Sequence, residues 1–287
     1  LSGETLCDWI CDAMVQQGLT VTNFGMASTP AMFMSTVTEG YTFDGSVMIT
    51  ASHLPFNRNG FKFFTCEGGL EKADIKAILT YAAGEEVTGL AAGTYVSGEF
   101  MDTYGKILAD KIRAATGMDK PLEGFRIVVD AGNGAGGFYA DKVLKPLGAN
   151  TDGSRYLEPD GSFPNHIPNP EDKKAMEAIT ESVNLAKADL GIIFDTDVDR
   201  AGAVLSDGSE LNRNRIIAML AAILLREHPG TTIVTDSITS TGLGKFIEEK
   251  GGIHHRFKRG YRNVINESIR LNELGQDSQL AIETSGH

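Results

Sequence analysis

The feature that most constrains the fold is the alternation of short apolar runs with helical segments along the whole chain. Extended runs are expected at 125–130, 189–194, 231–235 and 253–257, and segments with helical spacing lie between them. Strands that alternate with helices form mainly parallel sheets, and ligands bind beyond the carboxyl ends of such strands. The pattern restarts about every hundred residues, which is an ordinary domain size. We therefore expect an α/β protein of three consecutive domains, with mixed, mainly parallel sheets sandwiched by helices, at 1–98, 99–206 and 207–287.

The composition and net charge of the chain limit which kinds of molecule it is expected to bind. The chain has 287 residues, 41% of them hydrophobic, and a formal net charge of −12, so neither nucleic acid nor an anionic membrane surface is an expected partner. No apolar run approaches the roughly 20 residues of a membrane span, and we recognise no signal peptide. The three cysteines, Cys7, Cys11 and Cys66, form no CxxC pair. We therefore expect reduced thiols and a cytoplasmic protein.

A serine lies at the tip of a predicted loop between two strands. Ser52 follows an extended run at 47–50, and a second extended run begins near Phe61. Asn59-Gly60 predicts the turn that closes the loop, since both residues tolerate positive φ. Ser52 is therefore a candidate reactive hydroxyl, although an ordinary turn serine that only bonds its own backbone fits the same residues.

Three aspartates follow the apolar run at 189–194. Asp195, Asp197 and Asp199 alternate within one tight loop, and charges this close repel one another unless a cation lies among them. Oxygen ligands select a hard ion such as Mg²⁺, although a solvated acidic turn is the alternative. Arg200 ends the motif and would place a cationic fork suited to phosphate beside the metal.

A glycine-rich turn raises a second functional class. Gly132, Gly134 and Gly137 spell G-x-G-x-x-G after the run at 125–130, and Asp152 lies 20 residues beyond Gly132. This is the fingerprint of a dinucleotide site, so an NAD(P)-dependent oxidoreductase is an alternative function. A strand–helix turn that needs small residues for close packing gives the same pattern. A non-catalytic sugar-phosphate-binding module is a third interpretation.

Two further loops carry polar side chains after predicted strands. The basic stretch 258–261 suits a phosphate or a sugar hydroxyl, and plain surface charge is the alternative. In the stretch 283–287, Glu283 and Ser285 could bond paired sugar hydroxyls or belong to a plain loop. Lys62 follows the serine loop, and its long stem either keeps the charge in solvent or carries it to that loop.

Four of these stretches together resemble the α-D-phosphohexomutases, the family of phosphoglucomutases and phosphomannomutases. The stretch 50–62 is similar to the family's phosphoserine loop, and 195–200 is similar to its metal loop. The stretches 258–261 and 283–287 resemble its third-domain loop and its sugar-recognition loop. The match spans essentially the whole chain in order, and four spaced motifs are far more specific than one.

The resemblance implies an isomerase of carbohydrate metabolism, an intramolecular phosphotransferase that interconverts hexose 1-phosphate and hexose 6-phosphate. The hexose would be mannose or glucose, with glucosamine a less expected third, and the intermediate a hexose 1,6-bisphosphate. Ser52 would carry the phosphoryl group, and a phosphoserine oxygen would join the three aspartates around Mg²⁺. His53 would support the phosphoserine, Lys62 would assist proton transfer, and Arg200 would stabilise the transferring group. The implied substrate-binding residues are Lys258, Gly260, Tyr261, Glu283, Ser285 and His287. We expect a monomer or dimer whose partners are hexose phosphates.

The sequence departs from the family's pattern at two positions and at its ends. Leu54 stands where the phosphoserine loop usually has Asn, and Thr196 where the metal loop usually has Gly. The family's opening strand with its arginine-bearing loop, and its fourth domain, which grips the non-reacting phosphate, have no counterpart in these 287 residues. Orientation of the substrate and closure of the active site depend on such parts. We therefore expect the 287 residues alone to be weakly active or inactive.

Overall fold

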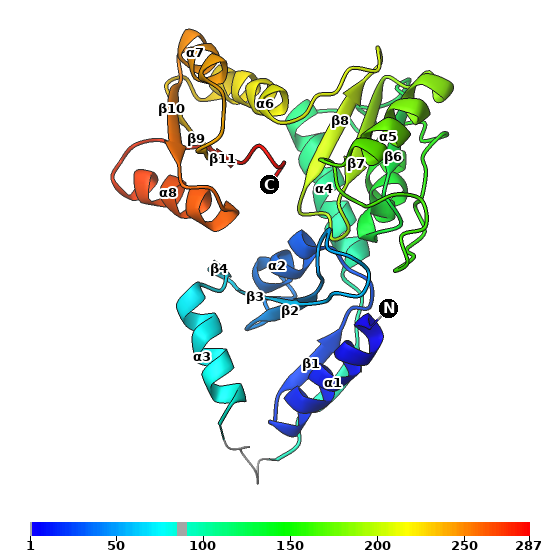
Figure 1. Cartoon of the computed structure of the whole chain (residues 1–287), viewed down its shortest axis with the longest axis vertical. Coiled ribbons are helices and arrows are strands. Elements are labelled where there is room, and N and C mark those ends of the chain that lie inside the picture. The colour runs from blue at the N-terminus through cyan, green and yellow to red at the C-terminus, as the bar shows by residue number, and fades with distance from the viewer. Residues whose placement is uncertain (1, 85–90) are drawn as a thin grey trace.

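The computed structural model, which describes residues 2–84 and 91–287, places four small sheets in three bodies that follow one another along the chain. Figure 1 shows a blue-to-cyan body below, a green body at the upper right and a yellow-to-red body at the upper left. The α/β fold class, with mixed sheets between helices, is confirmed. Leu1 and residues 85–90 lie outside the described residues, and residues 85–90 fall near the end of the first predicted domain, 1–98.

The first body joins a parallel strand pair to an antiparallel sheet. Its elements are α1 (Gly3–Gln16), β1 (Thr20–Asn23), α2 (Thr29–Val37), β2 (Ser46–Ile49), β3 (Phe61–Thr65), β4 (Gly68–Gly69), α3 (Lys72–Ala82) and β5 (Thr94–Ser97). β1 pairs in parallel with β5, whereas β3 pairs antiparallel with β2 and β4. Ser28 caps α2, because its hydroxyl accepts a hydrogen bond from the Ala31 amide, and Pro30 lies in the first turn.

The second body is a sheet covered on both faces. Its elements are α4 (Met101–Thr116), β6 (Ile127–Asp130), the short turns η1 (Ala135–Gly137), η2 (Tyr139–Leu144) and η3 (Lys145–Leu147), α5 (Lys173–Ala186), β7 (Leu190–Phe194) and β8 (Ala201–Leu205). β7 pairs in parallel with β6 and antiparallel with β8. Alternate residues of β6 face opposite sides, so Val128 packs with Ile179 of α5 while Val129 packs with Leu144 of η2.

One regular helix is expected after the glycine-rich turn, and the structure replaces it with the 3₁₀ and π turns η1 to η3. Pro146 lies in the last of these turns. Because proline has no amide hydrogen, it cannot continue the hydrogen-bond ladder of an α-helix. The helix α4 links this region to the first body, since Phe100 and Tyr104 pack with Ala31 while Ala109 packs with Leu147.

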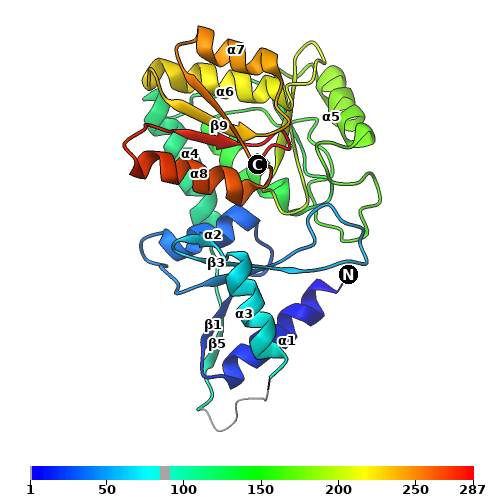
Figure 2. The ribbon, with the colours of Figure 1, turned by 60° about the vertical axis from the view of Figure 1, so that its left-hand side comes forward.

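The third body is a parallel sheet, and the segments that follow its strands lie at the same edge. Its elements are α6 (Asn214–Glu227), β9 (Thr232–Asp236), α7 (Thr241–Glu249), β10 (Ile253–Phe257), α8 (Tyr261–Glu273) and β11 (Leu280–Ile282). β9 lies between β10 and β11, and all three run in the same direction. Helices α6 and α7 cover one face, and α8 covers the other (Figure 2). The stretches 258–261 and 283–287 therefore leave the sheet at the same edge.

A carboxylate of the first body is hydrogen-bonded to the third body. Glu71 Oε1 accepts hydrogen bonds from Arg262 Nε at 3.0 Å, from Arg262 Nη2 at 2.7 Å and from Asn266 Nδ2 at 2.9 Å. This contact places the amino end of α8 beside the start of α3, so the loops of all three bodies face a common centre. Over residues 2–84 and 91–287, no helix has both the length and the apolar character needed to cross a membrane.

Candidate active site

The predicted phosphoryl-carrying serine lies against the predicted metal loop. Ser52 Oγ donates a hydrogen bond to Asp195 Oδ2 at 2.9 Å and accepts one from Arg200 Nη2 at 2.9 Å. Arg200 also donates to the same Asp195 oxygen, from Nε at 3.1 Å and from Nη2 at 2.9 Å. Asp195 and Arg200 are both buried. The hydroxyl is thus held between a buried carboxyl group and a fixed cationic fork.

The backbone of the serine loop reverses at Ser52 rather than at Asn59-Gly60. Ser52 has a φ of 51°, whereas neither Asn59 nor Gly60 has a positive φ. The predicted turn is wrong because the Gly60 carbonyl accepts a hydrogen bond from the Thr50 amide at 2.9 Å, which extends the ladder between β2 and β3. A left-handed non-glycine residue stores strain that is common at functional sites. The serine is therefore presented by a constrained tip.

The three aspartates converge, and their surroundings fit a cation. Asp195, Asp197 and Asp199 each offer a carboxylate oxygen within 4.8 Å of the other two. Burial, followed by repulsion from the other two carboxylates, raises the pKa of Asp195 to about 8. Asp197 Oδ1 and Asp199 Oδ1 are buried, and neither has a hydrogen-bond partner in the part of the chain that the structure describes. Buried carboxylate oxygens without donors are what a hard, oxygen-binding ion needs.

Lys62 reaches the same cluster from β3. Its Nζ lies 2.7 Å from Asp197 Oδ2 and 2.7 Å from Asp199 Oδ2. Burial lowers the pKa of Lys62, but the two carboxylates outweigh burial, and the pKa is raised above its ordinary value. Lys62 is therefore a cation whose charge reaches the metal loop, whereas the sequence had suggested solvent or the serine loop.

His53 lies on the other side of Ser52. Its Nδ1 is 3.3 Å from Ser52 Oγ and accepts a hydrogen bond from Arg200 Nη2. Burial and then the charge of Arg200 lower the pKa of His53, so the neutral ring is favoured. His53 therefore helps to orient the guanidinium that faces Ser52.

The stretch 283–287 of the third body contacts the aspartate cluster through His287. His287 Nε2 lies 3.4 Å from Asp199 Oδ2, and His287 Nδ1 lies 2.9 Å from Ser285 Oγ. The ring of Tyr261 stacks on that of His287 with centroids 5.6 Å apart. Glu283 Oε1 accepts a hydrogen bond from the Gly260 amide at 2.5 Å. Five of the six predicted substrate-binding residues are thus tied to one another or to the metal loop.

Lys258 is the sixth, and its side chain is exposed. It follows β10 at the edge where Gly260 and Tyr261 lie, but the structure does not bring it into the aspartate cluster. A long exposed ammonium at this edge is available to a phosphate that enters from solvent.

Two polar residues of the site escaped the sequence reasoning. Thr29, at the start of α2, donates from Oγ1 to Asp197 Oδ2 at 2.6 Å. Asp236, at the end of β9, accepts from Thr284 Oγ1 at 2.8 Å and lies 4.0 Å from Arg259 Nε. Thr29 lies at a helix start, and no local pattern in the sequence reports its contact with Asp197. Asp236 was available as a carboxylate at a strand end, the same signal that singled out Asp195.

The glycine-rich turn does not support the oxidoreductase interpretation. The amides of Asn133, Gly134 and Ala135 donate to the carbonyls of Tyr156, Ala131 and Thr196. An added Cβ at Gly134 would lie 2.6 Å from the Thr196 carbonyl oxygen, and one at Gly137 would lie 2.1 Å from that of Leu157. These amides are therefore engaged within the protein, and the glycines permit close packing behind the metal loop, as the alternative interpretation of the pattern expected.

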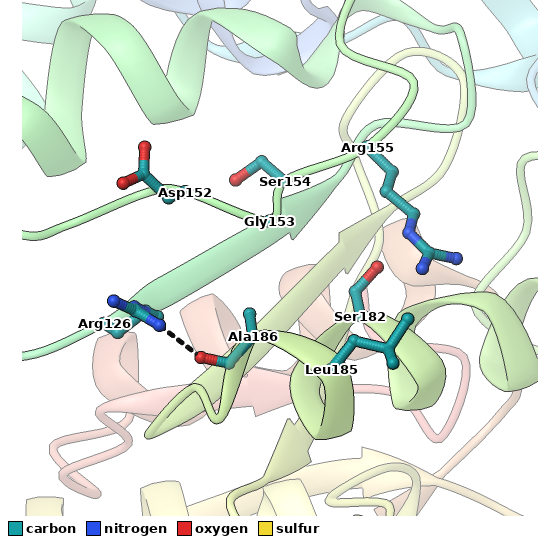
Figure 3. Close-up of a pocket in the computed structure, with 8 residues that line it drawn as sticks. All are labelled: Arg126, Asp152, Gly153, Ser154, Arg155, Ser182, Leu185 and Ala186. Atoms are coloured by element: carbon teal, nitrogen blue, oxygen red, sulfur yellow. Dashed lines mark hydrogen bonds between the residues drawn. The ribbon is translucent and has the colours of Figure 1, made fainter.

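A shallow hollow on the second body is a separate feature (Figure 3). It lies between the segment 152–155 and the carboxyl half of α5. Its two arginines are already paired, Arg126 with the Ala186 carbonyl and Arg155 with Glu181. None of the residues that line the hollow belongs to the serine loop (50–62), the metal loop (195–200) or the stretch 283–287.

Comparison with sequence models of protein families matches the chain in three successive parts. Residues 1–88 match phosphoglucomutase/phosphomannomutase alpha/beta/alpha domain I, residues 102–208 match domain II, and residues 212–287 match domain III. The three matches follow the same order as the three bodies of the structure.

Relatives with curated names agree with these matches. A phosphomannomutase/phosphoglucomutase of Pseudomonas putida is 33% identical over 288 aligned residues, covering 100% of this chain and 58% of the relative. A phosphoglucomutase of Neisseria gonorrhoeae is 32% identical and covers 100% of this chain and 59% of the relative. A crystal structure of a phosphoglucomutase/phosphomannomutase family protein from Burkholderia thailandensis superposes with a TM-score of 0.84 at 29% identity, over 100% of this chain and 61% of that one. Although it spans only about three fifths of the length of these relatives, the chain belongs to the phosphoglucomutase/phosphomannomutase family.

Proposed function

We propose that the protein is a phosphohexomutase that interconverts hexose 1-phosphate and hexose 6-phosphate of mannose or glucose. The phosphoryl group passes through Ser52, and a hexose 1,6-bisphosphate is the intermediate. The observation that carries the proposal is the position of the Ser52 hydroxyl, which is bonded to both Asp195 and Arg200 at the edge of a three-aspartate cluster. A turn serine that bonds only its own backbone would have neither partner.

The groups around Ser52 suit phosphoryl transfer, which requires positioning and charge stabilisation more than covalent help from the protein. In the forward step the bond between Ser52 Oγ and phosphorus breaks, and a bond from a sugar hydroxyl to phosphorus forms. Arg200 donates to the oxygen that leaves, and its planar fork matches phosphoryl oxygens. His53 holds that fork from the other side. The second half of the reaction returns the other phosphate of the bisphosphate to Ser52.

Proton transfer accompanies each half. In the first half the sugar hydroxyl loses a proton and the serine oxygen gains one, and in the second half the direction is reversed. We assign this relay to Lys62, which is protonated beside Asp197 and Asp199. A lysine on a flexible stem can carry a proton between two oxygens without a change in the loop backbone.

Asp195, Asp197 and Asp199, together with a phosphoserine oxygen on Ser52, would hold a metal ion. Mg²⁺ is the ion that we propose, because the ligand set consists of oxygen alone. When bound, Mg²⁺ supplies positive charge against the developing charge of the transferring group. The protein's own part is to keep the carboxylates converged and dry, and burial of Asp195 and Asp197 does so.

Substrate binding falls to the two loops of the third body. We propose that Glu283 and Ser285 bond the ring hydroxyls of the hexose, and that Gly260, Tyr261 and His287 line the same position. Lys258 meets the phosphate at the open edge. The contacts of His287 with Ser285 and Asp199 support a single site that joins sugar and metal.

The finer expectations about the molecule remain proposals. We propose domains at 1–98, 99–206 and 207–287 that carry the phosphoserine, metal and sugar-recognition loops in turn. We further propose a cytoplasmic monomer or dimer that acts on hexose phosphates. Because the resemblance puts the grip on the non-reacting phosphate in a fourth domain, we propose that these 287 residues alone turn substrate over weakly or not at all.

A coupled assay with glucose 1-phosphate and mannose 1-phosphate tests the proposal. The full-length protein should convert at least one of the two, and its Ser52→Ala variant should lose the conversion. The 287-residue chain should show little steady-state turnover with either sugar. Undiminished conversion by the Ser52→Ala protein would exclude Ser52 as the carrier, and turnover by the 287-residue chain at an ordinary enzyme rate would exclude the need for further parts.

A further inference from the structure

Helix α2 of the first body begins against the metal loop of the second. The Thr29 amide donates to the Asp197 carbonyl oxygen at 2.8 Å, and the Thr29 hydroxyl donates to Asp197 Oδ2 at 2.6 Å. Thr29 is 6% exposed and Asp197 is 1% exposed. One residue therefore holds both the backbone and the carboxylate of Asp197, although 168 positions separate the two in sequence.

The two oxygens of the Asp197 carboxylate have different surroundings. Oδ2 accepts from Thr29 Oγ1 and from Lys62 Nζ. Oδ1 is buried, and no partner for it is found across residues 2–84 and 91–287. A carboxylate whose one oxygen is saturated by donors can turn only a little, so the other oxygen keeps a fixed direction. This division leaves Oδ1 as the ligand atom for a cation.

Thr29 is the more rigid of the two donors. Lys62 reaches Asp197 through a flexible four-carbon stem. Thr29 stands in the first turn of α2, where the Ser28 cap and Pro30 fix the backbone. Thr29 can therefore set the orientation of Asp197 even when the lysine moves.

We propose that Thr29 is a positioning residue for the divalent-metal site, and that its hydroxyl orients Asp197 so that Oδ1 faces the ion. The inference rests on the proposed function, because it takes the aspartate cluster to be a metal site. It goes further in making the affinity for the metal depend on the docking of the first body onto the second. The first body, which carries Ser52, would thereby also set the affinity for the ion that the phosphoserine would bind.

The test is metal affinity, which does not require turnover. Mn²⁺ serves as the probe, since the signal of free Mn²⁺ in electron paramagnetic resonance reports how much is bound, and Mg²⁺ is then added as a competitor. The 287-residue protein is compared with the variants Thr29→Val, Thr29→Ser, Ser28→Ala and Asp197→Asn. Thr29→Val keeps the shape and the backbone bond but removes the hydroxyl, and Thr29→Ser restores the hydroxyl. Thermal unfolding without metal is measured for each protein.

Ser28→Ala is the matched control. It removes the cap of α2, whose hydroxyl accepts from the Ala31 amide at 3.2 Å, and it leaves the bonds from Thr29 to Asp197 in place. A general weakening of the helix start should therefore affect Ser28→Ala and Thr29→Val alike. Loss of orientation at Asp197 should affect only Thr29→Val.

We expect Thr29→Val to weaken Mn²⁺ and Mg²⁺ binding by about tenfold or more, the usual effect of removing a partner that orients a metal ligand. Thr29→Ser and Ser28→Ala should bind as the unaltered protein does, and Asp197→Asn should lose most of its affinity. If Thr29→Val binds normally while Asp197→Asn does not, the inference is wrong and the metal site stands. Equal weakening in Ser28→Ala, or no rescue by Thr29→Ser, also overturns the inference. If the unaltered protein binds no metal, both the site and the inference fall.

Discussion

Ser52 Oγ donates a hydrogen bond of 2.9 Å to Asp195 Oδ2, although 143 positions separate the two residues. The bond joins the tip of the serine loop in the first body to the carboxyl end of β7 in the second. Arg200, five positions beyond Asp195, completes the contact by donating to both residues. The proposed chemistry therefore depends on how the first two bodies dock.

Divalent metal should stabilise the folded protein. An ion that binds only the folded state adds about 2.7 kcal/mol when its free concentration is one hundred times its dissociation constant. Mg²⁺ should therefore raise the unfolding temperature of the 287-residue chain, and a chelator should reverse the rise. Replacing Asp195, Asp197 and Asp199 together by Asn should abolish the rise in calorimetric scans. A rise of the same size in the triple variant would mean that Mg²⁺ acts elsewhere.

Asp236 should control sugar binding rather than metal binding. Asp236→Ala removes the acceptor that holds Thr284 at 2.8 Å, next to Glu283 and Ser285. Hydrogen bonds to charged groups contribute roughly 1.5–3 kcal/mol, so loosening the loop should weaken glucose 1-phosphate binding by about tenfold in calorimetric titrations. Thr284→Val, which removes the donor instead, should behave similarly. Mn²⁺ affinity should be unchanged in both variants, and equal loss of both ligands would point to a collapsed fold instead.

The buried pair of His166 and Asp130 should make stability fall as pH rises. Burial lowers the pKa of His166, but the hydrogen bond and charge of Asp130 outweigh it and raise the pKa above the ordinary value of 6.5. Because the folded pKa is the higher one, the stabilisation is fully present below pH 6.5 and is lost as pH rises through the folded pKa. Denaturant unfolding at pH 6 and pH 8 measures the difference.

Two variants isolate that effect. His166→Gln should remove most of the pH dependence between pH 6 and pH 8, since it removes the titrating ring. Asp130→Asn should remove or reverse that dependence, since burial lowers the pKa of His166 and no carboxylate then opposes it. An unchanged pH dependence in both variants would mean that other groups cause it. The folded state must be verified first, because both side chains are buried.

Much of the fold follows from short-range patterns in the sequence. The cap at Ser28 and the strand that ends at Phe194 are local features, so their positions could be predicted within a few residues. The glycine-rich turn was ambiguous because close packing and phosphate binding both require glycine. The distant neighbours of Gly134 and Gly137, the Thr196 and Leu157 carbonyls, decide between the two interpretations. Hydrophobic periodicity predicted one helix after that turn and gave too little weight to Pro146, so the 3₁₀ and π turns were missed.

The predicted site residues were those at strand ends, and the missed ones depend on distant contacts. Asp195 and Glu283 follow apolar strands, where an α/β sheet collects its ligands. Thr29 has no such signal, because its role comes from a partner 168 positions away. The left-handed backbone at Ser52 was also missed, since the sequence favoured Asn59-Gly60 as the turn. The residue types at strand ends therefore predict which side chains belong to the site, whereas contacts between the bodies determine how those side chains are oriented.

The central claim, that Ser52 carries the phosphoryl group, is tested most directly by intact mass. The full-length protein is first treated with phosphatase, then incubated with glucose 1,6-bisphosphate and Mg²⁺, weighed by mass spectrometry and digested to locate any phosphate. We predict a gain of one phosphoryl group on Ser52, reversible by phosphatase and absent from the Ser52→Ala variant. A phosphoryl group found on another residue, or the same gain in Ser52→Ala, would contradict the account.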